Sequence, residues 1–235
     1  VTEEKIDKVK ANRKARKKTV SSKTCEHNVF THFPRAPDCD ICLGNRIQKA
    51  RCRSKAACER RPDATPIAVE FADRIVCDHK ILNEATESRD KDRAALVAQD
   101  AATWWIQGYA SQTKDAKETK AALRRFVGPY KEAKLVYSDN SGEIEAACKE
   151  LGWLHQTSTP HRSETNGVAE AAVKRVNQGT SCALDQSGWS EPWWKEAMRT
   201  YCFLRCVIDI LKDGHTPYFL RFQVHYNGPS FPCGC

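Results

Sequence analysis

Short strand patterns and longer helix patterns alternate along most of the chain. Apolar runs predict strands at 69–82, 134–138 and 154–159, with two more inside 94–111. Apolar side chains at three- and four-residue spacing, such as Leu123 and Phe126, are typical of a helix that covers a core. Helices are predicted at 115–127, 143–151, 167–186 and 193–211. This order predicts a mixed sheet with helices on its faces.

Three acidic residues stand out against this pattern. Asp78 interrupts the first strand, Asp139 ends the strand at 134–138, and Glu170 lies in the first turn of the helix at 167–186. A carboxylate in a buried strand costs free energy unless a cation pairs with it. Three converging carboxylates would hold one or two Mg²⁺ or Mn²⁺ ions, which suit phosphodiester cleavage. Singly, each acid also fits an ordinary role: an exposed strand residue, a turn residue or a helix N-terminal acid.

Histidines and cysteines gather in the polar segment before residue 63. His27 and His32 are followed by Cys39 and Cys42, a spacing that predicts a tetrahedral zinc site in a segment too polar to fold on apolar burial alone. Cys52 and Cys58 form a rival pair that could replace the two histidines, and Cys25 is a spare ligand. A cysteine turn without metal is the ordinary alternative.

Charge is concentrated in the same part of the chain. The net charge is +8, yet residues 1–61 carry 17 Lys and Arg against 7 Asp and Glu, while the remainder carries 21 against 23. This basic excess favours a polyanionic partner, most often nucleic acid, because binding releases counterions from phosphates. Residues 1–20 also fit a solvated tail, and residues 13–18 fit a nuclear-import patch.

Composition narrows the class of protein. With 40% apolar and 29% charged residues, the 235-residue chain is globular rather than fibrous, and it lacks the run of about 18 apolar residues that crosses a membrane. Most of the 12 cysteines lie inside apolar runs, which indicates buried thiols in a reducing, intracellular setting. We expect a basic arm at 1–24, a zinc segment at 25–62, a core at 63–187 and a helical extension at 188–235.

Two stretches resemble the second and third acidic motifs of retroviral and retrotransposon integrases. They are Tyr137-Ser138-Asp139-Asn140 and the segment from Thr159-Pro160 through Asn166-Gly167-Val168-Ala169-Glu170. The His and Cys cluster resembles the zinc-binding region before integrase cores, and Thr216-Pro217-Tyr218 is similar to the segment that follows the core in copia-like elements. The resemblance implies a ribonuclease-H-like fold with a five-stranded mixed sheet, preceded by a zinc-binding segment.

The resemblance also implies roles for individual residues. Asp78, Asp139 and Glu170 would bind two Mg²⁺ or Mn²⁺ ions, and the four upstream ligands would bind Zn²⁺. Asn166 would contact the DNA end, and His161 and Arg162 would lie in the flexible loop before the helix. Lys174, one turn after Glu170, would contact a phosphate, although a simple Glu–Lys helix pair explains it equally well.

The implied activity is that of an integrase released from a larger polyprotein. Such an enzyme trims the ends of element DNA and joins them to target DNA, works in the nucleus and acts as a homo-oligomer. Two alternatives stay open: a cut-and-paste transposase or nuclease of the same fold, and a decayed or domesticated DNA-binding module. The 30 residues between Asp139 and Glu170, fewer than is usual in the family, favour the last. Of the neighbours Trp104 and Trp105, at least one is expected in the core rather than as a base-stacking platform.

Overall fold

The computed structural model describes residues 27–45, 67–82, 86–157 and 163–235, and gives only the backbone of 163–166. The predicted basic arm at 1–24 lies outside these ranges. Cys25, Cys52, Cys58, His161 and Arg162 lie outside them as well. Within the described ranges, no helix combines the length and the apolar character needed to cross a membrane.

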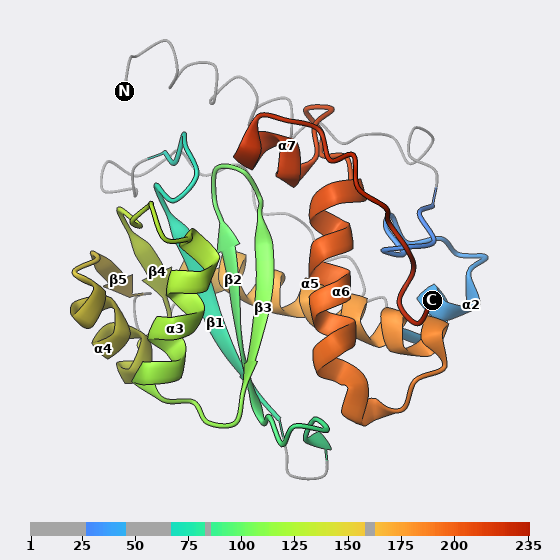
Figure 1. The fold of residues 1–235 in the computed structure, drawn as a ribbon, viewed down its shortest axis with the longest axis horizontal. Helices are drawn as coiled ribbons and strands as arrows, with labels where there is room; N and C mark the ends of the chain where they lie inside the picture. Colours follow the sequence, from blue (N-terminus) through green and yellow to red (C-terminus); the bar gives the residue numbers. More distant parts are fainter. Residues whose placement is uncertain (1–26, 46–66, 83–85, 158–162) are drawn as a thin grey trace.

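A five-stranded mixed sheet forms the centre of the fold (Figure 1). The strands are β1 Ile75–Ile81, β2 Ala94–Asp100, β3 Ile106–Ser111, β4 Val136–Ser138 and β5 His155–Thr157. Their order across the sheet is β3-β2-β1-β4-β5. β2 runs antiparallel to both β1 and β3, whereas β4 is parallel to β1 and β5 is parallel to β4. This arrangement confirms the predicted mixed sheet of five strands.

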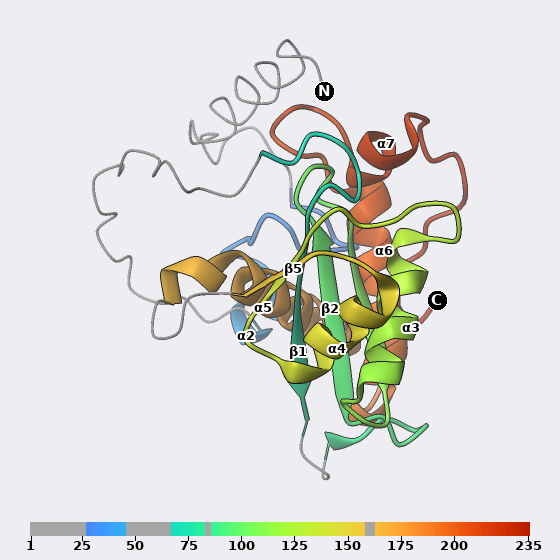
Figure 2. The ribbon, with the colours of Figure 1, turned by 90° about the vertical axis from the view of Figure 1, so that its left-hand side faces the viewer.

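Helices cover both faces of the sheet (Figure 2). Helices α3 Ala116–Val127 and α4 Gly142–Leu151 lie on one face, and the long helix α5 Ser163–Ser187 lies on the other. His79 of β1 contacts Thr119 of α3, with 3.2 Å between Nε2 and Oγ1. On the opposite face, Arg175 of α5 donates to the side chain of Gln99 in β2 at 3.0 Å. Because both faces are covered, every residue of β2 is buried.

The predicted helix at 115–127 illustrates how local sequence sets an element. The side chain of Asp115 accepts a hydrogen bond from the Glu118 amide at 2.7 Å and so satisfies one of the free donors at the helix start. Leu123 and Phe126 are fully buried against the sheet, as their spacing predicts. The helix ends at Gly128, whose φ of 95° lies in the region that favours glycine.

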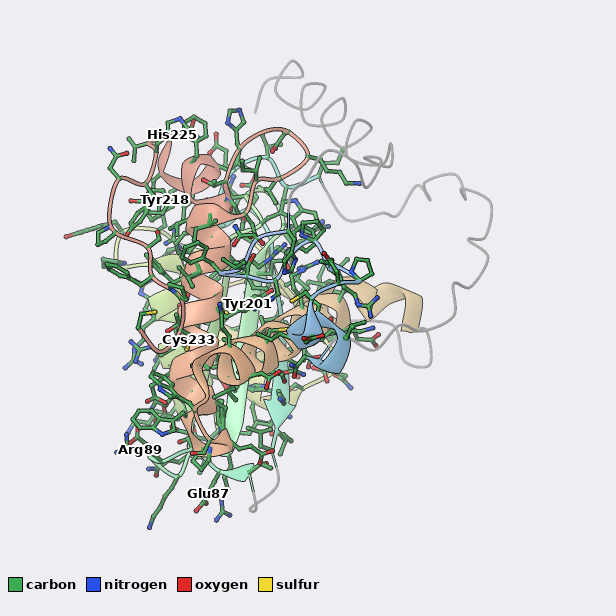
Figure 3. All side chains as sticks on the ribbon, turned by 90° about the vertical axis from the view of Figure 1, so that its right-hand side faces the viewer. Glu87, Arg89, Tyr201, Tyr218, His225 and Cys233 are labelled. Atoms are coloured by element: carbon green, nitrogen blue, oxygen red, sulfur yellow. The ribbon has the colours of Figure 1, made fainter. Side chains whose placement is uncertain are left out.

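The elements after α5 pack beside β3 and extend the core. The 3-10 turn η2 Glu191–Trp193 leads into helix α6 Trp194–Ile208, and a short helix α7 Pro217–Phe222 follows. Tyr201 of α6 (Figure 3) lies so close to Gly179 of α5 that a Cβ added to the glycine would come within 2.0 Å of the ring. Trp105 is buried beneath the Arg221 guanidinium of α7, 4.6 Å from its ring centre, which confirms that one of the paired tryptophans belongs to the core.

Several boundaries differ from the predicted ones. Helix α5 begins at Ser163, four residues before the predicted start, because its first turn has a polar sequence without apolar periodicity. Helix α6 ends at Ile208, three residues early, where Asp209 adopts an extended conformation. The two shortest helices, α2 Asp40–Asn45 and α7, were not predicted, because six residues are too few to show a repeat.

The segment that holds the predicted zinc ligands packs against the core. Thr31 donates a buried hydrogen bond to Asp209 at 2.6 Å, and Asp209 also pairs with Arg205. The Arg205 guanidinium lies 5.0 Å from the ring centre of Phe33. Two bonds attach the same segment to the end of α5: Gln186 donates to the Val29 carbonyl at 2.9 Å, and Asn45 donates to Asp185 at 2.9 Å.

Candidate functional site

Strand pairing brings Asp78 and Asp139 together. β1 and β4 are parallel, with Ile75 opposite Val136 and Val76 opposite Tyr137, an offset of 61 positions at both pairs. Asp78 and Asp139 are also 61 positions apart, so the same register, continued past the end of β4, brings Asp139 beside Asp78 in the middle of β1. Neighbouring strands are about 4.8 Å apart, and residues in register point to the same face.

Helix α5 carries Glu170 over the face to which Asp78 belongs. Asp78 alternates with Val76 along β1, and Val76 pairs with Gln99, the residue held by Arg175 of α5. Glu170 is exposed near the start of this helix, and Lys174 is exposed one turn later. Among the described side chains no ion pair joins Glu170 to Lys174, which leaves both carboxylate and ammonium open to solvent. Asn166 lies in α5, but its side chain is outside the described part.

The charges of Asp139 and Glu170 both act on the carboxyl group of Asp78. Burial, the negative charge of Asp139 and, to a lesser extent, that of Glu170 together raise the pKa of Asp78 to about 6, while the hydrogen bond of the His79 backbone and the charge of Lys114 oppose the shift. Asp78 therefore lies within the field of both other acids. A carboxylate whose pKa is raised by neighbouring negative charges is stabilised in its ionised form by a cation placed among them.

Asp139 has a carboxylate oxygen that the protein does not satisfy. Its Oδ1 is buried and makes no hydrogen bond in the structure. Buried carboxylate oxygens almost always have a partner, and an unpartnered one in a strand-end site fits an oxygen ligand of a divalent cation. The Asp139 backbone is in contrast well held, because its carbonyl accepts from the Ser141 amide at 2.9 Å and from the Ser138 hydroxyl at 2.7 Å.

The His and Cys residues form a compact group. One ligand atom from each of His27, His32, Cys39 and Cys42 lies within 4.8 Å of every other, the geometry of four ligands around one ion. Among the described residues the three carboxylates do not make a second group of that kind. The rival ligands Cys52 and Cys58 and the spare Cys25 lie outside the described ranges.

A hydrogen bond to the backbone orients the imidazole of His27, the first residue of this group. The Nδ1 of His27 lies 2.7 Å from the Pro34 carbonyl, so Nδ1 carries the proton and Nε2 keeps its lone pair. That Nε2 atom is buried without a hydrogen-bond partner. The Nδ1 of His32 lies 3.6 Å from the Cys39 sulfur. A soft cation such as Zn²⁺ fits this donor set of two imidazoles and two thiols.

Sequence reasoning missed the polar side chains around Asp139. Lys114, just before α3, pairs with Glu143 of α4 at 3.4 Å, and Ser141 donates to the same carboxylate at 2.7 Å. That hydrogen bond from Ser141 is the main reason why the pKa of Glu143 falls to about 2. On the other side, the Nε2 of His155 lies 2.8 Å from the Ser138 hydroxyl. The two serines flank Asp139 in the sequence, but nothing in the sequence links Lys114 or His155 to it.

Comparison with known proteins supports the resemblance to integrases. No family model matches the chain. Over 110 residues the chain is 28% identical to the "Retrovirus-related Pol polyprotein from transposon TNT 1-94" of Nicotiana tabacum. The match covers 43% of the chain and 8% of the polyprotein, so the chain corresponds to a small part of that relative.

Solved structures show the same fold. The catalytic core domain of HTLV-2 integrase, solved in complex with magnesium, superposes with a TM-score of 0.51 at 12% identity, and the match covers 65% of this chain and 98% of that domain. The catalytic core domain of BIV integrase matches with a TM-score of 0.48 at 18% identity, covering 65% and 95%. The likeness to the HTLV-2 domain shows that the chain has the ribonuclease-H-like fold of an integrase catalytic core, as the resemblance predicted.

Proposed function

We propose that this chain is a retrotransposon integrase that processes the 3′ ends of element DNA and transfers them to target DNA. The observation that carries the proposal is the β1–β4 register: continued two residues further, it would bring Asp78 beside Asp139 on the face covered by the helix that bears Glu170. The pKa of Asp78, raised to about 6 by burial and by the other two acids, supports a shared site for cations. The match to a retrotransposon polyprotein supports the origin.

Each acid has a distinct place in the proposed site. Asp78 and Asp139 would hold one ion and Asp78 and Glu170 a second, which agrees with the finding that both other acids act on Asp78. Two bound Mg²⁺ or Mn²⁺ ions would activate the attacking oxygen and stabilise the departing one. With water as the nucleophile the ends are trimmed; with a DNA 3′-hydroxyl they are joined to the target.

Further residues would hold the DNA and the fold. Lys174, exposed one turn from Glu170, would contact a backbone phosphate, together with Asn166, His161 and Arg162. His27, His32, Cys39 and Cys42 would bind Zn²⁺ and organise the segment that packs on α5 and α6. The same proposal includes the domain division at residues 24, 62 and 187. It also includes oligomeric assembly, release from a polyprotein and activity in the nucleus.

The decisive experiment replaces one acid without changing its size. Asp139→Asn should abolish Mn²⁺-dependent joining of a duplex oligonucleotide with free 3′-hydroxyls to a supercoiled plasmid, and should leave DNA binding within about twofold. Glu132→Gln, which neutralises an exposed acid outside the site, is the matched control and should keep full activity. Equal joining by wild type and Asp139→Asn would refute the proposal.

A DNA-binding module that has lost its chemistry is the second candidate. It is favoured by one observation: among the described residues the His and Cys group is compact enough for a single ion, whereas the three acids are not. If the zinc-loaded wild type binds DNA but shows no metal-dependent cleavage or joining, this second function replaces the first.

A further inference from the structure

We propose that His155 is a positioning residue for Asp139 and acts through the hydroxyl of Ser138. The proposal deepens the function above, because it concerns how one of the three acids is held in place. Ser138 ends β4 and is fully buried, and His155 begins the neighbouring edge strand β5. The parallel β4–β5 ladder pairs Val136 with His155, so the imidazole can reach along the sheet to the strand end.

The direction of the hydrogen bonds follows from counting protons. The Ser138 hydroxyl has one proton and donates it to the Asp139 carbonyl at 2.7 Å. The Nε2 of His155, 2.8 Å from the same hydroxyl oxygen, must then be the donor of the second bond. The result is a chain of two bonds that runs from the imidazole through the serine to the backbone of the acid.

Asp139 depends on its backbone contacts, because one oxygen of its carboxylate has no hydrogen-bond partner. Its Oδ1 is buried without a hydrogen-bond partner, so no bond at that atom fixes the side chain. The backbone carbonyl is fixed instead, by Ser138 from one side and by the Ser141 amide from the other. Without the imidazole donor, the Ser138 hydroxyl is free to rotate towards another acceptor, and one of the two anchors of Asp139 weakens.

The expected effect is on the acid site rather than on DNA binding. Groups that orient a metal ligand from behind typically change metal affinity by about 10- to 100-fold when removed. His155→Leu and Ser138→Ala should therefore each weaken Mn²⁺ binding at the acids about tenfold and lower kcat for joining in proportion. KM for DNA should stay unchanged, because neither side chain is among the residues proposed to touch DNA.

The experiment compares His155→Leu with His155→Gln in the 235-residue chain after it has been loaded with zinc. The amide nitrogen of Gln can occupy the place of Nε2 and donate to Ser138, so His155→Gln should keep Mn²⁺ affinity within about threefold of wild type. Mn²⁺ affinity is measured by paramagnetic resonance titration, which does not depend on activity. Gln156→Leu, at the exposed neighbouring position of β5, controls for placing leucine in this strand.

A double variant guards against effects that are merely structural. If His155 acts through Ser138, then Ser138→Ala combined with His155→Leu should bind Mn²⁺ no more weakly than Ser138→Ala alone. Additive losses, wild-type affinity in His155→Leu, or equal affinities for His155→Gln and His155→Leu would each overturn the proposal. Should His155→Leu not fold, the pair Ser138→Ala and Ser138→Thr gives the same comparison, with Thr expected to retain the relay.

The outcomes separate this inference from the proposed function. Loss of Mn²⁺ affinity in His155→Leu, with no joining by wild type, would keep the positioning role and reject the integrase activity. Loss of joining in Asp139→Asn, with unchanged Mn²⁺ affinity in His155→Leu, would support the integrase activity and reject the positioning role of His155.

Discussion

At the scale of one residue, the raised pKa of Asp78 lowers the stability of the metal-free protein at neutral pH. Its pKa is raised to about 6, chiefly by burial and then by the charge of Asp139, from an ordinary value of 3.8. Between these two values the folded state holds more protons than the unfolded state. Stability therefore falls as the pH rises from about 4 to about 6, and the loss persists at neutral pH.

Asp78→Asn should stabilise the protein when no Mg²⁺ or Mn²⁺ is added. At pH 7.5 we expect a gain of about 1 kcal/mol in the free energy of unfolding, a value reduced from the full shift because the side chain is only half-buried. Near pH 4 the gain should vanish, since the wild-type carboxyl is then protonated in the folded state. Urea denaturation of wild type and variant at both pH values measures the difference in the free energy of unfolding. A variant less stable than wild type at pH 7.5 would contradict the prediction.

The residues of the site differ in how visible they are in the sequence. Asp78 interrupts an apolar strand run, Asp139 ends another, and Glu170 stands in the first turn of a predicted helix, so all three could be selected from the sequence. His155 and Lys114 could not, because their contacts with Ser138 and Glu143 arise from strand and helix packing between distant segments. His27 could be proposed as a ligand, but only the bond to the Pro34 carbonyl shows which of its nitrogens is available.

At the scale of elements, the contact between α5 and α6 depends on one glycine. An added Cβ at Gly179 would lie 2.0 Å from the Tyr201 ring, and Tyr201 is itself buried and cannot move aside freely. At Gly167 of the same helix an added Cβ meets nothing within 4 Å. The two glycines therefore provide opposite tests of the same substitution.

Gly179→Ala should lower the free energy of unfolding by at least about 2 kcal/mol, because the helices must separate to admit the methyl group. Gly167→Ala should raise it by about 0.5–1 kcal/mol through better helix propensity. Chemical denaturation of both variants measures the difference. Similar stabilities for the two would show that α6 does not approach α5 as closely as described.

Pattern reasoning located the five strands and the longer helices but missed the six-residue helices α2 and α7. The helix at 115–127 and the strand that became β2 carry enough apolar positions to define a period. Helices α2 and α7 depend on capping and tertiary contact instead, as when Thr216 accepts a bond from the Phe219 amide at 3.1 Å. The arrangement of the strands in the sheet could be anticipated only through the family resemblance. The spacing of apolar residues within a strand does not show which other strand it pairs with.

At the scale of the whole molecule, the segment that holds the His and Cys group is joined to the core by buried polar hydrogen bonds and an ion pair. Thr31, Asp209 and Arg205 form a chain at the end of α6, and loss of one partner leaves buried polar atoms unsatisfied. The predicted zinc site begins four residues before Thr31 and includes its neighbour His32. Metal binding and packing against α6 therefore act on the same few residues.

Thr31→Val should cost about 1–2 kcal/mol of stability, and removal of zinc with a chelator should reduce hydrogen-exchange protection at the end of α6. Thr113→Val, at an exposed threonine outside this contact, is the control and should leave protection at α6 unchanged. Unaltered exchange at the end of α6 after zinc removal would show that the two parts are energetically independent.

The long helix α5 has Glu170 near one end and the attachment points Asp185 and Gln186 near the other. At 1.5 Å per residue these ends are about 22 Å apart along one continuous rod. The two groups of candidate metal ligands therefore meet the same helix at opposite ends, and the contact of Arg175 with the sheet lies between them. A change at one group can reach the other only through a helix that the sheet also holds.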